Sequence, residues 1–140
     1  MLVHLVRLPR LAQALLLVAV FDLVGAAVAA HAGLAGAQTA IVSGTAINAP
    51  IPFLAAQLAI LGVATAFAHR RIGTAAAAFL AAMGTVSVVS GFGDGSFGHA
   101  LTAPERAIQL GLVTTTAVTV LFAVTQVAHA LRRPDAIATA

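Results

Sequence analysis

The feature that most constrains the fold of this chain is a set of four long apolar runs that contain between them a single formally charged residue, Asp22. The runs cover about 11–31, 50–68, 72–90 and 107–131. A helix of about 20 apolar residues crosses the roughly 30 Å hydrocarbon layer of a membrane. Membrane β-strands are shorter and alternate polar with apolar residues, which these runs do not. We therefore expect an all-α fold, a single integral membrane domain (1–140) built as a bundle of four transmembrane helices.

The composition excludes the main soluble classes of protein. Of the 140 residues, 61% are hydrophobic and 8% are charged, whereas a soluble domain carries about 25% charged residues. Disorder requires the opposite balance, with low hydrophobicity and high charge. The absence of cysteine excludes disulfides, thiolate metal sites and dithiol redox chemistry.

The arginines predict the orientation in the membrane. Cytoplasmic loops are enriched in arginine and lysine, and here six of the seven arginines flank the runs on one side: Arg7, Arg10, Arg70, Arg71, Arg132 and Arg133. We therefore expect both termini to be cytoplasmic, in a bacterial inner membrane, with two loops facing outward near 32–49 and 91–103. Arginines placed at the ends of apolar runs do not form a basic face, so no nucleic-acid partner is expected. The first run is longer than the apolar part of a signal peptide, which favours a retained span.

Prolines mark two expected helix starts. Asn48 and Thr102 each stand two residues before a proline, Pro50 and Pro104. A polar side chain before a proline in the first helical turn is typical of an N-cap. Thr102 together with Glu105 also fits a capping box.

The acid in the first run is the leading candidate for a functional residue. Burying Asp22 at that depth costs at least about 2.5 kcal/mol on insertion scales unless it is partnered or neutral. Its helical neighbours Gly25, Ala26 and Ala29 are small, so this face is expected to pack against another helix. Two roles remain open: a neutral acid that donates a hydrogen bond within the bundle, or a proton- or cation-coupling residue.

A polar stripe on the last run offers a surface opposite this acid. At 100° per residue, five side chains fall within about a third of the helix circumference. They are Gln109, Thr116, Thr119, Ala123 and Gln126. The favoured interpretation is hydrogen bonding between packed helices. The alternative is a polar path lined by Asp22, Gln57, Gln109 and Thr116.

The sequence gives little support for a metal or cofactor site. Four residues near the outward ends could gather around a divalent metal: His31, Asp94, His99 and Glu105. Imidazole and carboxylate suit such an ion, but no ligand spacing supports the site, so we expect solvated side chains. The remaining histidines also lie at the membrane faces, which disfavours haem ligation. The GxGxxG string at 93–98 lacks the βαβ unit of a dinucleotide site. No cofactor is expected.

Small residues recur at helix-packing spacing in the two middle runs, and they let helix backbones approach closely. They are Ala55, Ala59, Gly62 and Ala66 in the second run and Gly73, Ala77, Ala81, Gly84 and Ser87 in the third. Because no catalytic constellation accompanies them, we expect a non-enzymatic protein. It would be a small subunit or accessory of an oligomer or a larger membrane complex, with the bilayer and other subunits as partners. The alternative is a small proton- or cation-coupled transporter using Asp22. A membrane enzyme using the outer cluster ranks below both.

Overall fold

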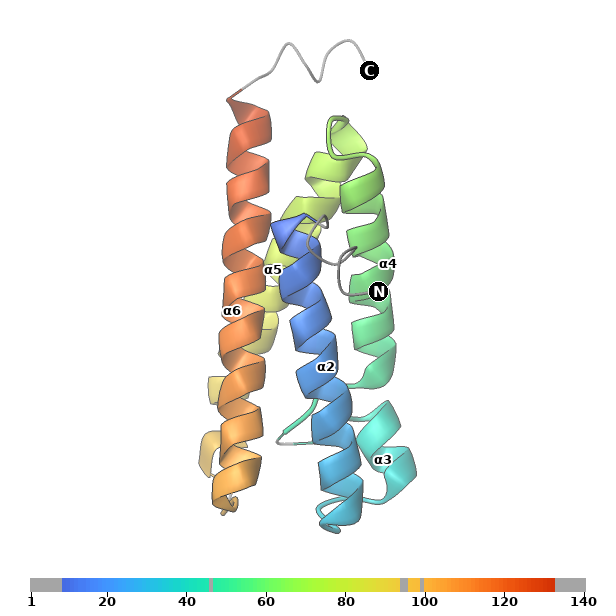
Figure 1. Cartoon of the computed structure of the whole chain (residues 1–140), viewed down its shortest axis with the longest axis vertical. Coiled ribbons are helices and arrows are strands. Elements are labelled where there is room, and N and C mark those ends of the chain that lie inside the picture. The colour runs from blue at the N-terminus through green and yellow to red at the C-terminus, as the bar shows by residue number, and fades with distance from the viewer. Residues whose placement is uncertain (1–8, 46, 94–95, 99, 133–140) are drawn as a thin grey trace.

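The computed structural model describes residues 9–45, 47–93, 96–98 and 100–132. Within these residues the chain is helical and forms no strand, apart from one isolated bridge between Thr45 and Asn48. The elements are α2 (Arg10–His31), α3 (Ala37–Val42), α4 (Ile51–Ala66), α5 (Arg71–Gly93), the 3₁₀ helix η1 (Ser96–Gly98) and α6 (Ala103–Leu131). The four longer helices form one elongated bundle, with α3 beside the end of α2 (Figure 1). The predicted all-α fold is confirmed.

Three of these helices are long and apolar enough to cross a membrane: α2 with 22 residues, α5 with 23 and α6 with 29. The shorter α4 has 16 residues, about 24 Å at 1.5 Å per residue. That is less than the roughly 30 Å of the hydrocarbon layer. The run at 50–68 was expected to form a full span. Instead, α3 continues the layer of α4 toward the far end of α2 (Figure 1).

The two expected helix caps have different outcomes. The capping box of α6 is confirmed, because the Thr102 amide donates to Oε2 of Glu105 at 2.7 Å and the Thr102 side chain accepts from the backbone of Glu105. The expected cap by Asn48 is wrong, because α4 starts after Pro50 and has no side-chain cap. Prolines at positions 50 and 52 remove N–H groups from this first turn, so fewer donors need a cap.

Small residues let α5 pack closely on its neighbours. Gly73, Ala77, Ala81 and Gly84 are buried, while Ser87 is half-buried. A Cβ at Gly84 would lie 2.5 Å from Cγ2 of Val120 on α6. A Cβ at Gly73 would collide with the carbonyl oxygen of Phe67 in the α4–α5 turn. The expectation of close approach is thus confirmed for the third run.

The small residues of α4 behave differently. Ala55, Ala59, Gly62 and Ala66 are exposed, and a Cβ at Gly62 would meet nothing within 4 Å. The closely packed side of α4 uses Leu54, Leu61 and Ala64 instead. The small-residue face of α4 therefore has no packing partner in the described part of the chain.

The polar stripe of α6 faces the bundle as expected. Gln109, Thr116, Thr119 and Ala123 are buried. Half-buried Gln126 reaches α4, where its Nε2 donates to the carbonyl oxygen of Ala64 at 3.2 Å. The threonines do not bridge helices, because Thr116 and Thr119 donate to the carbonyls of Leu112 and Thr115 on their own helix.

Candidate functional site

The chain between α3 and α4 returns into the bundle and meets α2. We call residues 43–45 and 47–50 the inner turn. Its apolar residue Ile47 is 0% exposed and its polar residue Asn48 is 3% exposed. Residues 32–49 were expected to form an outward-facing loop, but part of this segment packs against α2 at Gly25. A Cβ there would collide with the carbonyl oxygen of Ile47 and lie 3.2 Å from Cβ of Asn48.

Hydrogen bonds fix the shape of the inner turn. The Thr45 hydroxyl donates to Oδ1 of Asn48 at 2.5 Å, and the Thr45 amide donates to the Asn48 carbonyl at 2.9 Å. Nδ2 of Asn48 donates to the carbonyls of Ala40 at 2.8 Å and Ala49 at 2.9 Å. Gly44 has φ +74°, and a Cβ there would lie 2.8 Å from the Asn48 carbonyl oxygen. The polar groups of this non-helical backbone are thereby largely satisfied, as irregular backbone inside a membrane protein requires.

Asp22 holds the inner turn from α2, and its two carboxyl oxygens differ. Oδ1 accepts a hydrogen bond from the amide of Ala49 at 2.5 Å. Oδ2 is buried and has no hydrogen-bond partner among the described residues. The whole side chain is 1% exposed. A buried carboxyl oxygen without a partner is energetically unfavourable, so such a group calls for an explanation.

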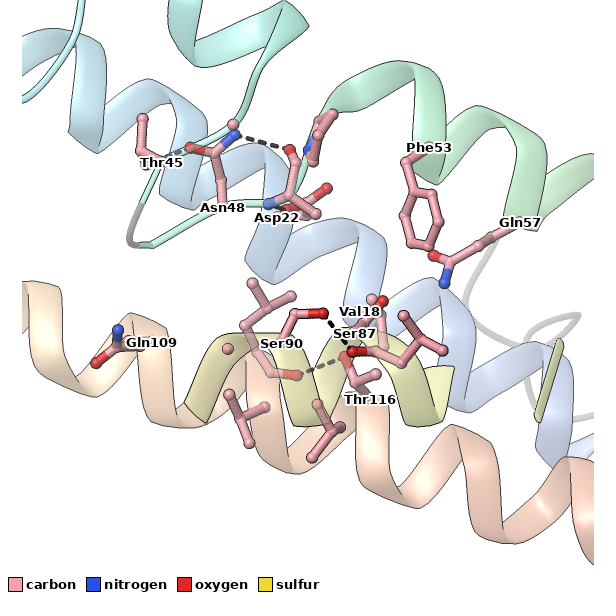
Figure 2. Close-up of a pocket in the computed structure, with 18 of the residues that line it drawn as sticks. Val18, Asp22, Thr45, Asn48, Phe53, Gln57, Ser87, Ser90, Gln109 and Thr116 are labelled. Carbon is pink, nitrogen blue, oxygen red and sulfur yellow. Dashed lines mark hydrogen bonds between the residues drawn. The ribbon is translucent and has the colours of Figure 1, made fainter. Parts of the chain in front are cut away.

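Asp22 also lines a pocket of about 510 Å³. Helices α2, α4, α5 and α6, the inner turn and η1 all contribute to its wall. The four residues of the predicted polar path, Asp22, Gln57, Gln109 and Thr116, all line it. Figure 2 shows Thr45 and Asn48 beside Asp22, with Ser87, Ser90 and Thr116 gathered where α5 meets α6. The structure thus brings together residues that are up to 94 positions apart in the sequence (22 and 116).

Three hydroxyl groups of the pocket lining already donate hydrogen bonds to backbone carbonyls. Ser87 donates to the Met83 carbonyl at 3.0 Å, and Ser90 donates to the Val86 carbonyl at 2.6 Å. Thr116 donates to its own helix, as described above. Since a hydroxyl has one donor and two acceptor lone pairs, these groups present acceptors to the pocket.

Two glutamines stand at different places in the wall. Gln109 is buried and its Oε1 accepts from Nη1 of Arg106 at 2.5 Å. The same guanidinium lies 5.9 Å from the ring centroid of Phe97, which stacks on Phe92 at 4.6 Å. Gln57 is also buried, and no described residue forms a hydrogen bond with its side chain.

The outer cluster considered as a metal site is not assembled by the described residues. Within them, no group of three or more acids and histidines is placed to hold a metal ion. His31 is exposed at the end of α2, and Glu105 is used by the capping box of α6. Asp94 and His99 lie outside the described residues.

Sequence reasoning missed several residues of this site. Thr45 was not singled out, and Asn48 was expected only as a helix cap, because the segment before Pro50 resembles an ordinary loop. The Gly44 and Pro50 pair marks an interrupted helix, and that was the available signal. Ser87 and Ser90 escaped because hydroxyl residues are common in packed membrane helices. Phe53, which lines the pocket beside Gln57 (Figure 2), carries no distinguishing pattern.

No protein-family model, curated protein or solved structure matches the chain. The class of protein must therefore be inferred from the sequence and the structure alone. It is a helical protein with three helices suited to crossing a membrane. A buried acid and a pocket lie between those helices.

Proposed function

We propose that the protein is a small proton- or cation-coupled transporter in which Asp22 is the coupling residue. The observation that carries this proposal is that the two oxygens of the Asp22 carboxyl group have different environments. Oδ1 holds the inner turn through Ala49, while Oδ2 is buried and has no hydrogen-bond partner among the described residues. Asp22 also lines the pocket. An ionisable residue at membrane depth marks an ion or substrate pathway by default.

In the proposed mechanism, Asp22 couples cation binding to proton release. A proton and a cation compete for the same carboxylate, so a cation that binds at Oδ2 displaces the proton. Either occupant also withdraws charge from Oδ1, and hydrogen bonds to a carboxylate are about twice as strong as those to a neutral group. Occupancy at Oδ2 therefore changes the strength with which Asp22 holds the inner turn. The turn forms part of the pocket wall, so binding is linked to access.

The proposed orientation places both termini in the cytoplasm of a bacterium, with the chain in its inner membrane. The start of α2, the α4–α5 turn and the end of α6 lie toward the same end of the bundle (Figure 1). Arg10, Arg70, Arg71 and Arg132 belong to these three places. Such clustering follows the positive-inside rule. In this orientation α3, the inner turn and α4 together form the fourth, interrupted crossing.

Exchange in proteoliposomes tests the proposed function. We expect a pulse of external Na⁺, K⁺ or guanidinium to make the interior of wild-type vesicles alkaline, as an enclosed pH dye reports. Asp22→Asn should abolish the response, because the amide cannot release a proton. Glu105→Gln is the matched control: it removes the same charge but keeps a capping residue. Wild-type vesicles that respond to none of the three cations, or Asp22→Asn vesicles that still respond, would contradict the proposal.

A second candidate function, a subunit of an oligomer or larger complex, is favoured by the small-residue face of α4. Small residues in membrane helices usually lie in helix–helix interfaces. Here Ala55, Ala59, Gly62 and Ala66 are all exposed. A second copy of the chain or another membrane subunit would cover them.

Cysteine crosslinking distinguishes this candidate, because the chain has no cysteine of its own. If α4 meets a second copy, Gly62→Cys in native membranes should form a disulfide-linked dimer on mild oxidation. Leu121→Cys, at a 59% exposed position on α6, should stay monomeric. The readout is a non-reducing gel. Equal crosslinking of the two variants would indicate random collision and argue against an interface on α4.

A further inference from the structure

The charged and hydrogen-bonding groups that line the pocket indicate the sign of the charge on its ligand. Among the described residues that line it, Asp22 is the one with a formal charge. The hydroxyls of Ser87, Ser90 and Thr116 have donated to backbone carbonyls and present lone pairs. Amide donors of the inner turn are also used, since Nδ2 of Asn48 bonds two carbonyls. The Gln57 amide still offers N–H donors, but the acceptors together with the one acid favour a cation that brings its own donors.

The dimensions of the pocket argue against a bare metal ion as its principal ligand. Its volume of about 510 Å³ lies within the range of roughly 300–1,000 Å³ that is typical of small-molecule sites. Apolar side chains cover much of the wall, among them Val18, Phe53 and Leu112. The phenyl ring of Phe53 lies close to Gln57 (Figure 2), and aromatic faces attract cations. An ion alone would leave these apolar surfaces without a partner.

We infer that the pocket binds a small organic cation with N–H donors, a protonated amine with an apolar body. Its ammonium group donates to Oδ2 of Asp22 and to the hydroxyl oxygens of Ser87 and Ser90. Its carbon body packs against Val18, Phe53 and Leu112. This inference rests on the proposed function only in naming the cation of the same Asp22 site.

Calorimetry on the full chain tests the ligand class. The protein is placed in nanodiscs of phosphatidylcholine alone and titrated with benzylammonium at neutral pH, with empty nanodiscs as the blank. We expect saturable one-to-one binding of benzylammonium and none of benzoate or benzyl alcohol. Benzyltrimethylammonium has no N–H donor and should bind at least about tenfold more weakly. Binding of benzyl alcohol as strong as that of benzylammonium, or no binding of benzylammonium, would overturn the inference.

Two variants locate the site. Asp22→Asn should weaken benzylammonium binding by about tenfold or more, the effect of losing one charge-assisted hydrogen bond. Ser87→Ala should weaken it by roughly two- to tenfold, and it disturbs only a bond within α5. Glu105→Gln should leave it unchanged. Circular dichroism and size-exclusion profiles confirm that each variant is folded. Unchanged affinity in both pocket variants would overturn the assignment.

The outcomes separate this inference from the proposed function. If Na⁺ or K⁺ drives proton exchange but benzylammonium does not bind, the ligand class is wrong and the transporter proposal stands. If benzylammonium binds through Asp22 but no cation moves protons in vesicles, the amine site stands and coupled transport is wrong.

Discussion

Replacing Gly25 with leucine is expected to expel the inner turn from the bundle. The backbone of Ile47 lies directly against Gly25, and even a single Cβ would lie 3.0 Å from its carbonyl carbon and collide with its oxygen. Backbone cannot rotate away as a flexible side chain can, so the turn must move. A cysteine at Ala40, which is 1% exposed on α3, reports this movement through its reaction with maleimide. We expect it to react at least about tenfold faster in the Gly25→Leu background.

Gly25→Ala tests the same contact with a smaller side chain, so a smaller effect is expected. Alanine favours a helix over glycine by about 1 kcal/mol, whereas overpacking costs about 1–3 kcal/mol. The clash therefore outweighs the helix preference, and the free energy of unfolding should fall. Gly62→Ala is the matched control, because a Cβ there meets nothing within 4 Å and only the helix preference acts. Equal stability changes for the two substitutions, measured by unfolding in detergent, would show that the turn does not press on α2.

Three of the helices could be predicted from the sequence because their cause is local, whereas α3 was not expected and α4 is shorter than the predicted span. Apolar runs of membrane length fix α2, α5 and α6, and the Thr102 and Glu105 pair fixes the start of α6. The buried face of α2 also followed from its small residues, since Gly25, Ala26 and Ala29 are all buried. Each of these signals lies within one turn or one helix face.

The inner turn could not be predicted, because its cause is not local. The segment around Asn48 contains turn residues that suit a solvated loop equally well. Its burial depends on Gly25, which is 23 residues earlier in the sequence and leaves room for the Ile47 backbone. The candidate site could be predicted only in part. Asp22 and Thr116 were already grouped in the alternative polar path, but the shape of their common pocket depends on the packing of α2 against α6 and on the inner turn.

The contrast between Asp22→Leu and Asp22→Asn should separate the two tasks of this residue. Asparagine keeps Oδ1 as an acceptor for the Ala49 amide, although a neutral acceptor is about half as strong as a carboxylate. Leucine removes the acceptor and leaves that amide unsatisfied, which costs about 1–3 kcal/mol. We therefore expect the Ala40→Cys reporter to react slowest with Asp22, faster with Asn and fastest with Leu, the last by about tenfold or more. Ile41→Cys, at the 50% exposed neighbouring position, should react at the same rate in all three backgrounds.

The membrane insertion energy of residue 22 favours the Leu variant, but it does not decide the reactivity of the thiol at position 40. On insertion scales, leucine at the centre of a membrane helix is favoured over aspartate by about 3–4 kcal/mol. That gain belongs to α2 whether or not the inner turn is docked, so it cancels from the docking equilibrium that the thiol reports. If the Leu and Asn variants both protect the thiol as well as Asp22 does, then Ile47 packing alone holds the turn. If Asn protects the thiol but abolishes proton exchange, then Oδ1 serves the structure and the ionisable carboxyl serves the coupling.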